Sequence, residues 1–351
     1  MRLHSLFLQG VRFGDSVTLP CTQLKRGIVN NLMLMIILLC FYIDRCQQSL
    51  LLPFIAQGPS VDWPATCGVP VVPPRTPESR LLNSVEAEPH SWPWQVSLSG
   101  SSHPPPLSPC PGNYWHVHAC GGSLIHQEWI LTAAYCFTEL SESNMWRACL
   151  GKHHASPAEE PAEVCYFVDR IVTHHSYSYP QDYDISNDIA LVHLAQKAYT
   201  TREISPICLP EDDKVLPEGT RCYVTGWGDA RGEVFSMVSR PLTQAALPLV
   251  SLETCRQPQY WWDGVWSSMI CAGYESPDEF KSACQGDSGG PLVCRPEGGI
   301  STWELHGVVT FGPRSCAKDS KPSVFTRVSA FSRWIRGEIE RFAHERSSLA
   351  N

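Results

Sequence analysis

The sequence lacks an apolar run long enough to cross a bilayer as a helix. Residues 32–43 (LMLMIILLCFYI) form a run of 12 residues, whereas a spanning helix needs about 20. A run of this length after Lys25 and Arg26 is typical of a signal peptide, so we expect a secreted, extracellular chain. The cleavage site stays open, as does a start of translation at Met33 or Met35. A membrane anchor would require residues 50–55 to continue a broken span, and we do not expect one.

The sequence also lacks an excess of basic residues. Its 27 Lys and Arg against 35 Asp and Glu give a formal net charge of -8. No basic face for nucleic acid is expected from this balance. The chain has no Asn-x-Ser/Thr sequon, which argues against N-glycosylation, and no long internal repeat.

Clusters of cysteine and histidine at the spacing of a zinc site are missing too. The 16 cysteines are too many for a set of buried free thiols, and they predict disulfides formed in an oxidising compartment. The histidine pairs at 153–154 and 174–175 are adjacent, without the spacing of ligands on one helix face. We therefore expect exposed loop histidines, no metal and no other cofactor.

Regular structure is predicted to be almost entirely strand. Alternating runs such as 94–98 and 304–311, interrupted by Gly, Pro and Asn, favour an all-β barrel or sandwich. Proline-rich residues 67–80 are typical of a linker, and residues 99–114 of a surface loop. One helix is expected near the C-terminus, where apolar residues recur at three- and four-residue spacing (Phe331, Trp334, Ile335, Ile339 and Phe342).

The clearest chemical motif is CQGDSGGP at 284–291. A serine between small residues lets the backbone approach a substrate carbonyl, so Ser288 is the candidate nucleophile. The N–H groups of Ser288 and Gly286 are the candidate oxyanion hole. Five further motifs accompany it: SWPWQVSL (91–98), CGGSLI (120–125), LTAAYC (131–136), NDIAL (187–191) and TGWG (225–228).

In this order the motifs resemble those of trypsin/chymotrypsin-like serine proteases (peptidase S1), nearest to chymotrypsin-C-like or elastase-like members. The resemblance implies two packed six-stranded antiparallel β-barrels, near 94–194 and 206–328, with a C-terminal α-helix and the site at their interface. It implies a division of the chain into an N-terminal segment that includes a signal peptide (1–66), an activation peptide (67–80), a protease domain (81–344) and a tail (345–351).

The resemblance assigns Ser288 as nucleophile and Asp188 as the carboxylate that orients a histidine, but Tyr135 stands in the histidine position. An imidazole accepts the serine proton near pH 7, whereas a phenol, with a reference pKa of about 10, is already protonated there. Loss of the histidine costs on the order of a millionfold in kcat, or about 8 kcal/mol. Neither His126 nor the pair at 153–154 fits as a replacement.

The sequence therefore predicts a pseudoprotease that binds peptides or proteins without efficient cleavage. The alternative is an active endopeptidase in which Tyr135 is a natural variant, a sequence error, or a residue bypassed by another base. A decayed, purposeless gene product is a third reading. Expected partners are peptide or protein ligands and protease inhibitors.

Family positions also describe a pocket and an activation site. Ser282 would form the pocket base and Gly312 and Ser323 its walls; a neutral base favours apolar P1 side chains, unless the pocket is vestigial. Thr310 and Phe311 alter the wall that pairs with substrate backbone. Activation would cut after Arg80 and dock the amine of Leu81 against Asp287, with Ser84 where a glycine is usual.

The resemblance implies a set of disulfides and leaves six cysteines open. Cys149 and Cys165 flank one loop and are a possible pair, while Cys110 is left to bond a partner, to bond Cys46 or to stay a free thiol, and Cys21 and Cys40 are unassigned. The loop 151–164 matches a calcium loop of some relatives, but Lys152 replaces its first glutamate ligand. The implied bridges are Cys67–Cys208, Cys120–Cys136, Cys222–Cys294, Cys255–Cys271 and Cys284–Cys316.

Overall fold

The computed structural model describes nine stretches of the chain. They are residues 61–76, 84–101, 118–155, 160–178, 185–228, 241–273, 287–295, 302–312 and 321–350. All lie within one compact unit, residues 59–351, while residues 1–58 form a second unit that is outside the described part. Within the described stretches, none of the helices has the length and apolarity needed to span a bilayer.

Six antiparallel strands close into a first barrel in the order β2-β3-β4-β7-β6-β5. Most of its strands are buried along their length, because the barrel interior faces one side and the second barrel or a helix covers much of the other. The strands are β2 (Gln95–Gly100), β3 (His118–His126), β4 (Trp129–Thr132), β5 (Trp146–Leu150), β6 (Val164–Thr173) and β7 (Ala190–Leu194).

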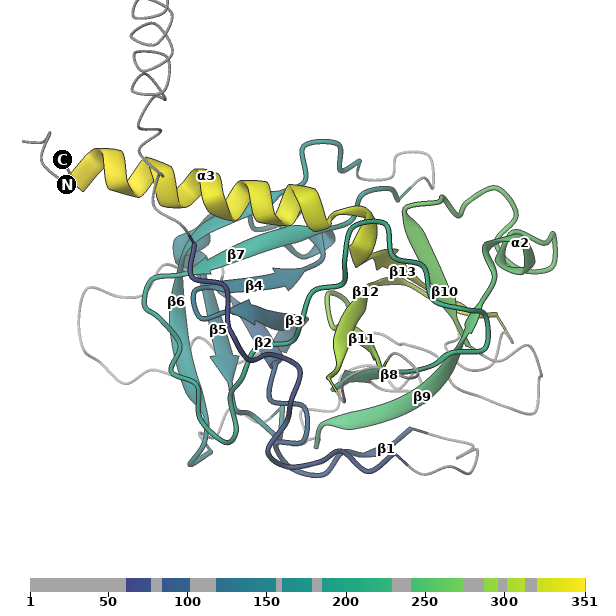
Figure 1. Cartoon of the computed structure of the whole chain (residues 1–351), viewed down its shortest axis with the longest axis horizontal. Coiled ribbons are helices and arrows are strands. Elements are labelled where there is room, and N and C mark those ends of the chain that lie inside the picture. The colour runs from purple at the N-terminus through teal and green to yellow at the C-terminus, as the bar shows by residue number, and fades with distance from the viewer. Residues whose placement is uncertain are drawn as a thin grey trace, which may run out of the picture. The chain divides into compact units, whose positions relative to one another are not determined.

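A second set of six strands closes through the pairing of β8 with β9, in the order β9-β10-β13-β12-β11-β8. The short β1 (Val85–Glu86) pairs with the first two residues of β9, on the side opposite β8. Figure 1 shows this barrel in green and yellow beside the first in blue and teal. Its strands are β8 (Arg221–Gly226), β9 (Thr243–Val250), β10 (Met269–Ala272), β11 (Pro291–Cys294), β12 (Glu304–Phe311) and β13 (Ser323–Arg327).

Aromatic side chains join the two barrels. The ring of Trp92, just before β2, packs edge-on against Trp303 at 5.1 Å and lies 5.7 Å from Tyr223 on β8. Trp94 follows two residues later and is fully buried. Large rings at this position exclude water from the interface. Their burial stabilises the fold by well over the few kcal/mol that one buried aliphatic side chain contributes.

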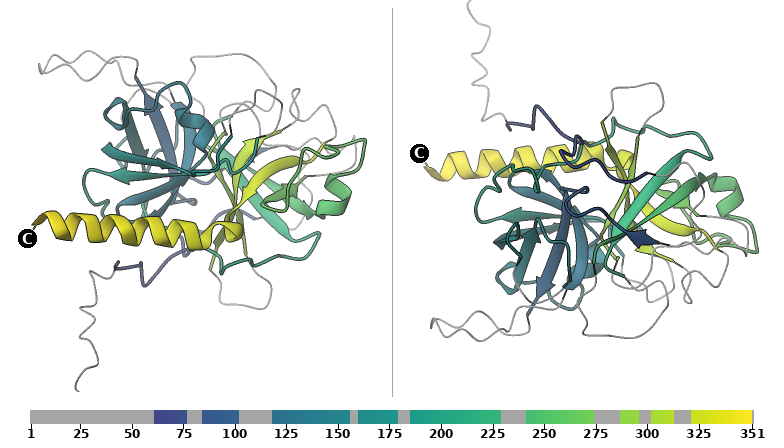
Figure 2. Two further views of the ribbon diagram at one scale, coloured as in Figure 1. Left: turned by 90° about the horizontal axis from the view of Figure 1, so that it is seen from above. Right: turned by 90° about the horizontal axis from the view of Figure 1, so that it is seen from below.

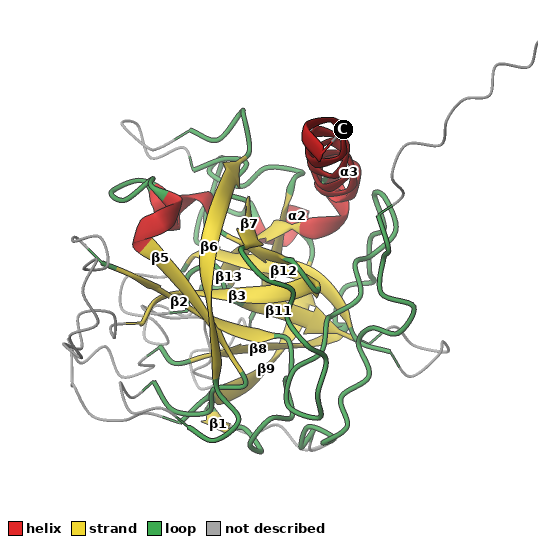
Figure 3. Ribbon diagram, turned by 90° about the vertical axis from the view of Figure 1, so that its left-hand side faces the viewer, coloured by secondary structure: helices red, strands yellow, loops and turns green. Residues whose placement is uncertain are grey.

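The C-terminal helix α3 (Ser332–Ala350) runs along the first barrel (Figures 1 and 2). Ile335 and Ile339, one turn apart, are buried, and Phe342 packs against Trp129 of β4 at 5.2 Å. Figure 3 shows α3 almost end-on, beside the strands that make up most of the structure. The predicted double barrel with a C-terminal helix is confirmed.

Five disulfides are present in the described part of the chain. Four are pairs that the family resemblance implies, and the fifth joins Cys149 of β5 to Cys165 of β6. The implied bridge between Cys284 and Cys316 lies outside the described residues, as do Cys21, Cys40, Cys46 and Cys110. The four implied bridges that are present are Cys67–Cys208, Cys120–Cys136, Cys222–Cys294 and Cys255–Cys271.

Candidate active site

The turn that carries Ser288 is fastened to the first barrel. The backbone N–H of Gly121 on β3 donates to the carbonyl of Ser288 at 2.8 Å, and Gly290 donates to Asp287 at 2.8 Å. Gly289 has a φ of 79°, and a Cβ there would overlap Thr132 on β4. Glycine is therefore required at this position, both for its backbone angle and for the close approach of the two barrels.

The carboxylate of Asp287 is enclosed by the TGWG motif. Its Oδ1 accepts a hydrogen bond from the N–H of Gly228 at 2.9 Å, and a Cβ on Gly226 or Gly228 would overlap the carboxylate. The two glycines thus leave the volume that this buried acid occupies. Arg80 and Leu81, the proposed activation residues, lie outside the described part of the chain.

Asp188 is buried at the start of the strand region that leads into β7. Its Oδ1 accepts a hydrogen bond from the backbone N–H of Tyr135 at 2.8 Å, and its carbonyl accepts one from the Thr326 hydroxyl at 2.8 Å. Its Oδ2 has no hydrogen-bond partner. One oxygen of a carboxylate that is only 1% exposed therefore lacks a donor.

Burial raises the pKa of Asp188 to about 7. The backbone N–H groups of Tyr135 and Ala134 and the nearby Thr310 hydroxyl act in the opposite direction and lower this pKa. The contribution of Thr310 to the decrease is small. Its single proton is directed to Val308 O at 3.2 Å or to Thr326 Oγ1 at 2.9 Å, because the Thr326 proton is used on the Asp188 carbonyl. Burial thus favours the neutral, protonated form of Asp188.

Tyr135 lies in the short 3-10 helix η1 (Ala134–Phe137), directly beside Asp188. Its side chain is 45% exposed. Since Asp188 Oδ2 accepts no hydrogen bond, the phenol is not oriented by this carboxylate as an imidazole would be. The backbone N–H of Tyr135 thus donates to Oδ1 of Asp188, while Oδ2 of the same carboxylate accepts no hydrogen bond.

The three histidines weighed as replacement bases are engaged elsewhere. His126 shares a hydrogen bond through Nε2 with Asp62 O at 2.9 Å, and burial lowers its pKa. His153 is buried, contrary to the expectation of an exposed loop histidine, because its carbonyl accepts from the indole of Trp227 and its Nε2 lies 3.2 Å from Glu86. His154 is half-buried near Glu160.

The predicted pocket is described only in part. Ser323 begins β13 and is fully buried, and Thr310 on β12 contacts β13 through Thr326. The ring of Phe311 packs against Trp261 at 5.1 Å. Gly312 follows it, whereas Ser282 and the oxyanion residue Gly286 are outside the described residues.

The loop 151–164 holds a buried ion pair in place of a cation site. Nζ of Lys152 donates to both carboxylate oxygens of Glu163, at 2.9 and 2.8 Å, and both side chains are at least nine-tenths buried. Glu160 accepts hydrogen bonds from the backbone N–H groups of His153 and His154. The ammonium of Lys152 thus supplies positive charge to these acids.

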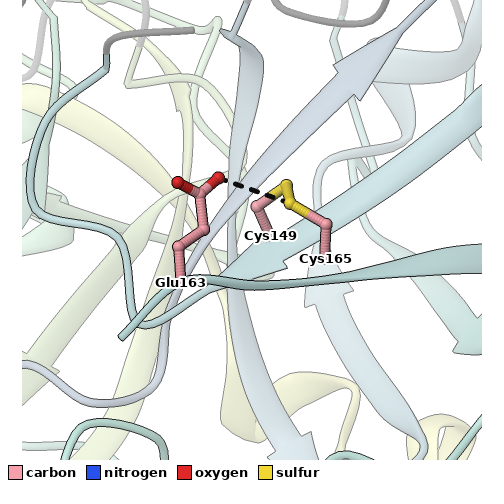
Figure 4. A group of neighbouring side chains, drawn as sticks. All are labelled: Cys149, Glu163 and Cys165. Atoms are coloured by element: carbon pink, nitrogen blue, oxygen red, sulfur yellow. Dashed lines mark hydrogen bonds between the residues drawn. A yellow bond between two sulfur atoms is a disulfide. The ribbon is translucent and has the colours of Figure 1, made fainter. Parts of the chain in front are cut away.

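Figure 4 shows Glu163 beside the disulfide of Cys149 and Cys165, with Oε1 of Glu163 3.3 Å from Sγ of Cys165. The three side chains have the spacing of metal ligands. The two sulfurs are bonded to each other, however, so neither is a thiolate that binds a metal or a thiol that donates a proton. This group is a covalent link between two strands.

Sequence reasoning missed the hydroxyl pair of Thr310 and Thr326 that supports the backbone around Asp188. A threonine on each of two adjacent strands gave no signal, because their pairing depends on the strand register. The structure brings Asp188 against Tyr135, and the Ser288 turn against Thr132, three residues before Tyr135. Residues 132–135, which precede and include Tyr135, thus lie against both Asp188 and the turn that carries Ser288.

Comparisons with known proteins agree with this geometry. A family model described as Trypsin matches residues 82–335. Chymotrypsin-C of Bos taurus is 37% identical over 279 residues, which cover 79% of this chain and 95% of the relative. Chymotrypsin-C of Rattus norvegicus is 38% identical over 275 residues, covering 78% and 94% respectively. The chain belongs to the trypsin family of serine proteases.

Proposed function

We propose that this chain is a secreted, catalytically impaired member of its family that binds peptide segments of other proteins without efficient cleavage. The observation that carries the proposal is Oδ2 of Asp188, which accepts no hydrogen bond although the backbone of Tyr135 lies against the same carboxylate. A serine without an oriented base stays a weak nucleophile. Ser288, held by Gly121, keeps a position from which it contacts a bound carbonyl.

The ligand class follows from the predicted pocket. A base at Ser282 without charge, and walls at Gly312 and the buried Ser323, fit an apolar P1 side chain. Peptides with such a residue, and protease inhibitors that present one, are the proposed ligands. Secretion is supported by the five disulfides and by the similarity to chymotrypsin-C.

An active endopeptidase is the second candidate, and two observations favour it. Curated relatives at 37% identity are named as a chymotrypsin. In addition, a carboxyl with a pKa of about 7, as Asp188 has, is poised for proton transfer near neutral pH. In that case Asp188 itself, through a water molecule, would replace the histidine as base.

Binding and turnover of one apolar-P1 peptide separate the two candidates. The protein is treated with trypsin, cleavage after Arg80 is verified by mass spectrometry, and peptide binding is measured by calorimetry alongside product release. We expect saturable binding with no product above the rate of the Ser288→Ala variant. Turnover that exceeds this variant and is lost in Asp188→Asn would establish the endopeptidase instead.

A further inference from the structure

The segment between α2 (Leu252–Cys255) and β10 forms a rigid platform on the second barrel. The disulfide of Cys255 and Cys271 joins its two ends. Inside this loop Nε of Arg256 donates to the carbonyl of Val265 at 2.6 Å. A surface that is already ordered loses little conformational entropy when a ligand binds to it.

Two tryptophans of this platform are exposed. Trp262 is 59% and Trp266 43% exposed, although indoles are usually well buried. Trp262 also has a φ of 51°, in the left-handed region that is unfavourable for a bulky residue. Strain of this kind persists at binding sites, and here it holds a large apolar ring in water.

The exposed rings border an open hollow of about 480 Å³. This volume is within the range of ligand sites and accommodates a few side chains of a peptide. Apolar surface dominates the lining. The lining residues are Arg256, Pro258, Trp262, Asp263 and Trp266.

The hollow is separate from the predicted substrate cleft. Trp261, the residue before Trp262, packs against Phe311 of the cleft wall at 5.1 Å and donates through Nε1 to Pro322 O at 2.8 Å. Trp261 does not line the hollow. The adjacent indoles of Trp261 and Trp262 thus face two different surfaces, and neither Tyr135 nor Ser288 lines the hollow.

The lining of the hollow carries one side chain of each sign, Arg256 and Asp263. Asp263 is exposed and forms no ion pair with any residue of the described stretches. The net charge of the chain is -8, which favours a basic partner. Arg256 is tied to Val265 through Nε, which leaves its other guanidinium N–H groups as hydrogen-bond donors for a ligand.

We propose that residues 256–266 bind a proline-rich, basic segment of a partner protein in the extended polyproline conformation. Proline rings pack against indole faces in aromatic-lined grooves, and the polyproline helix is formed before binding at little entropic cost. Its free carbonyls accept from Arg256, and a basic side chain of the segment pairs with Asp263. Each lining residue thereby has a partner of matching chemistry.

A labelled synthetic peptide tests this proposal. The chain itself contains a segment of the required composition at 70–75 (PVVPPR), so the decapeptide of residues 68–77 serves as probe. Binding to the full chain is followed by fluorescence anisotropy. We expect saturable binding that weakens about tenfold or more in Trp262→Ala. Asp263→Asn should weaken the binding of this peptide, yet leave unchanged the binding of a peptide in which alanine replaces the arginine.

Two matched variants control the experiment. Phe167→Ala removes a ring that is 57% exposed on β6 of the other barrel, and we expect unchanged affinity. Tyr135→His should also bind the probe normally, so failure of the proposed function and failure of this proposal are distinguishable. Cooperative urea unfolding of each variant verifies its fold.

Equal affinity of Trp262→Ala and the natural chain, or no saturation at millimolar peptide, would overturn the proposal. Sedimentation of the chain alone provides a further check. A dimer that forms at micromolar concentration and is lost in Trp262→Ala would assign the hollow to a second copy and contradict a partner protein.

Discussion

Asp188 combines two features that are rarely stable together, a buried carboxylate and an oxygen without a donor. In a protein with histidine at position 135, the imidazole N–H would meet Oδ2 and favour the ionised form. Here burial dominates and the pKa rises to about 7. Asp188 therefore destabilises the folded state at any pH at which its carboxyl must ionise.

The sign of this effect gives a prediction for pH. The folded pKa of about 7 lies above the unfolded value of about 3.9. Below pH ~4 both states are protonated; between ~4 and ~7 only the unfolded state ionises, so the contribution of Asp188 to stability falls as pH rises. Asp188→Asn should thus unfold at higher urea than the natural chain at pH 8, by on the order of 1–3 kcal/mol.

At pH 4 the same two proteins should unfold at nearly equal urea concentrations, because the natural carboxyl is then neutral in both states. Urea titrations at the two pH values, with disulfides intact, measure the difference. A gap between the proteins that is the same at pH 4 and pH 8 would contradict the raised pKa of Asp188.

At the scale of elements, the loop from β5 to β6 depends on the ion pair of Lys152 with Glu163. Both side chains are almost fully buried, so removing the ammonium leaves a carboxylate without a counter-charge. Breaking such a pair costs about 3–5 kcal/mol. We expect Lys152→Met to lower the free energy of unfolding by about this amount.

Lys152→Glu extends the argument to calcium. It places a third carboxylate with Glu160 and Glu163, so the metal-free protein should be destabilised by like charges. Calcium binds such oxygen clusters, and binding to the folded state alone raises stability. The melting temperature of Lys152→Glu should rise with millimolar calcium, while that of Lys152→Met stays constant; no rise in Lys152→Glu would refute this reading of the loop.

The disulfide between β5 and β6 gives a second prediction for these elements. Cys149 and Cys165 lie opposite each other in the strand register, and the bridge closes a separation of 16 residues. A loop of this size contributes about 3 kcal/mol by restricting the unfolded chain. Replacing both cysteines by alanine should lower stability by about that amount in urea titrations. An unchanged midpoint would mean that the bridge does not form.

For the molecule as a whole, the double barrel was predictable because motifs such as CGGSLI, which lies on β3, and NDIAL, which leads into β7, occur in the order of a known family. The C-terminal helix was predictable from the spacing of Ile335 and Ile339, which the structure buries. Sequence also identified Tyr135 as the departure, since its neighbours in LTAAYC match. The positions of the site were therefore predicted from local motifs together with their resemblance to a known family.

Contacts that depend on tertiary packing could not be predicted. The burial of His153 results from Trp227 and Glu86, which are distant in sequence. The pairing of Cys149 with Cys165 was left open, because only the register of β5 and β6 places them together. Likewise, no pattern indicated that Trp262 would be held in solvent, since exposure is decided by the turn that carries it.

The most direct test of the impaired site is the kcat/KM of the natural chain and of Tyr135→His on apolar-P1 peptides, after verified cleavage at Arg80. Tyr135→Phe is the matched control, since the phenol is not held by Asp188. We predict that only Tyr135→His cleaves these peptides. Its kcat/KM should exceed that of the natural chain by several orders of magnitude, approaching the roughly millionfold effect of a catalytic histidine. A natural chain as fast as Tyr135→His would contradict the account and require a base other than residue 135.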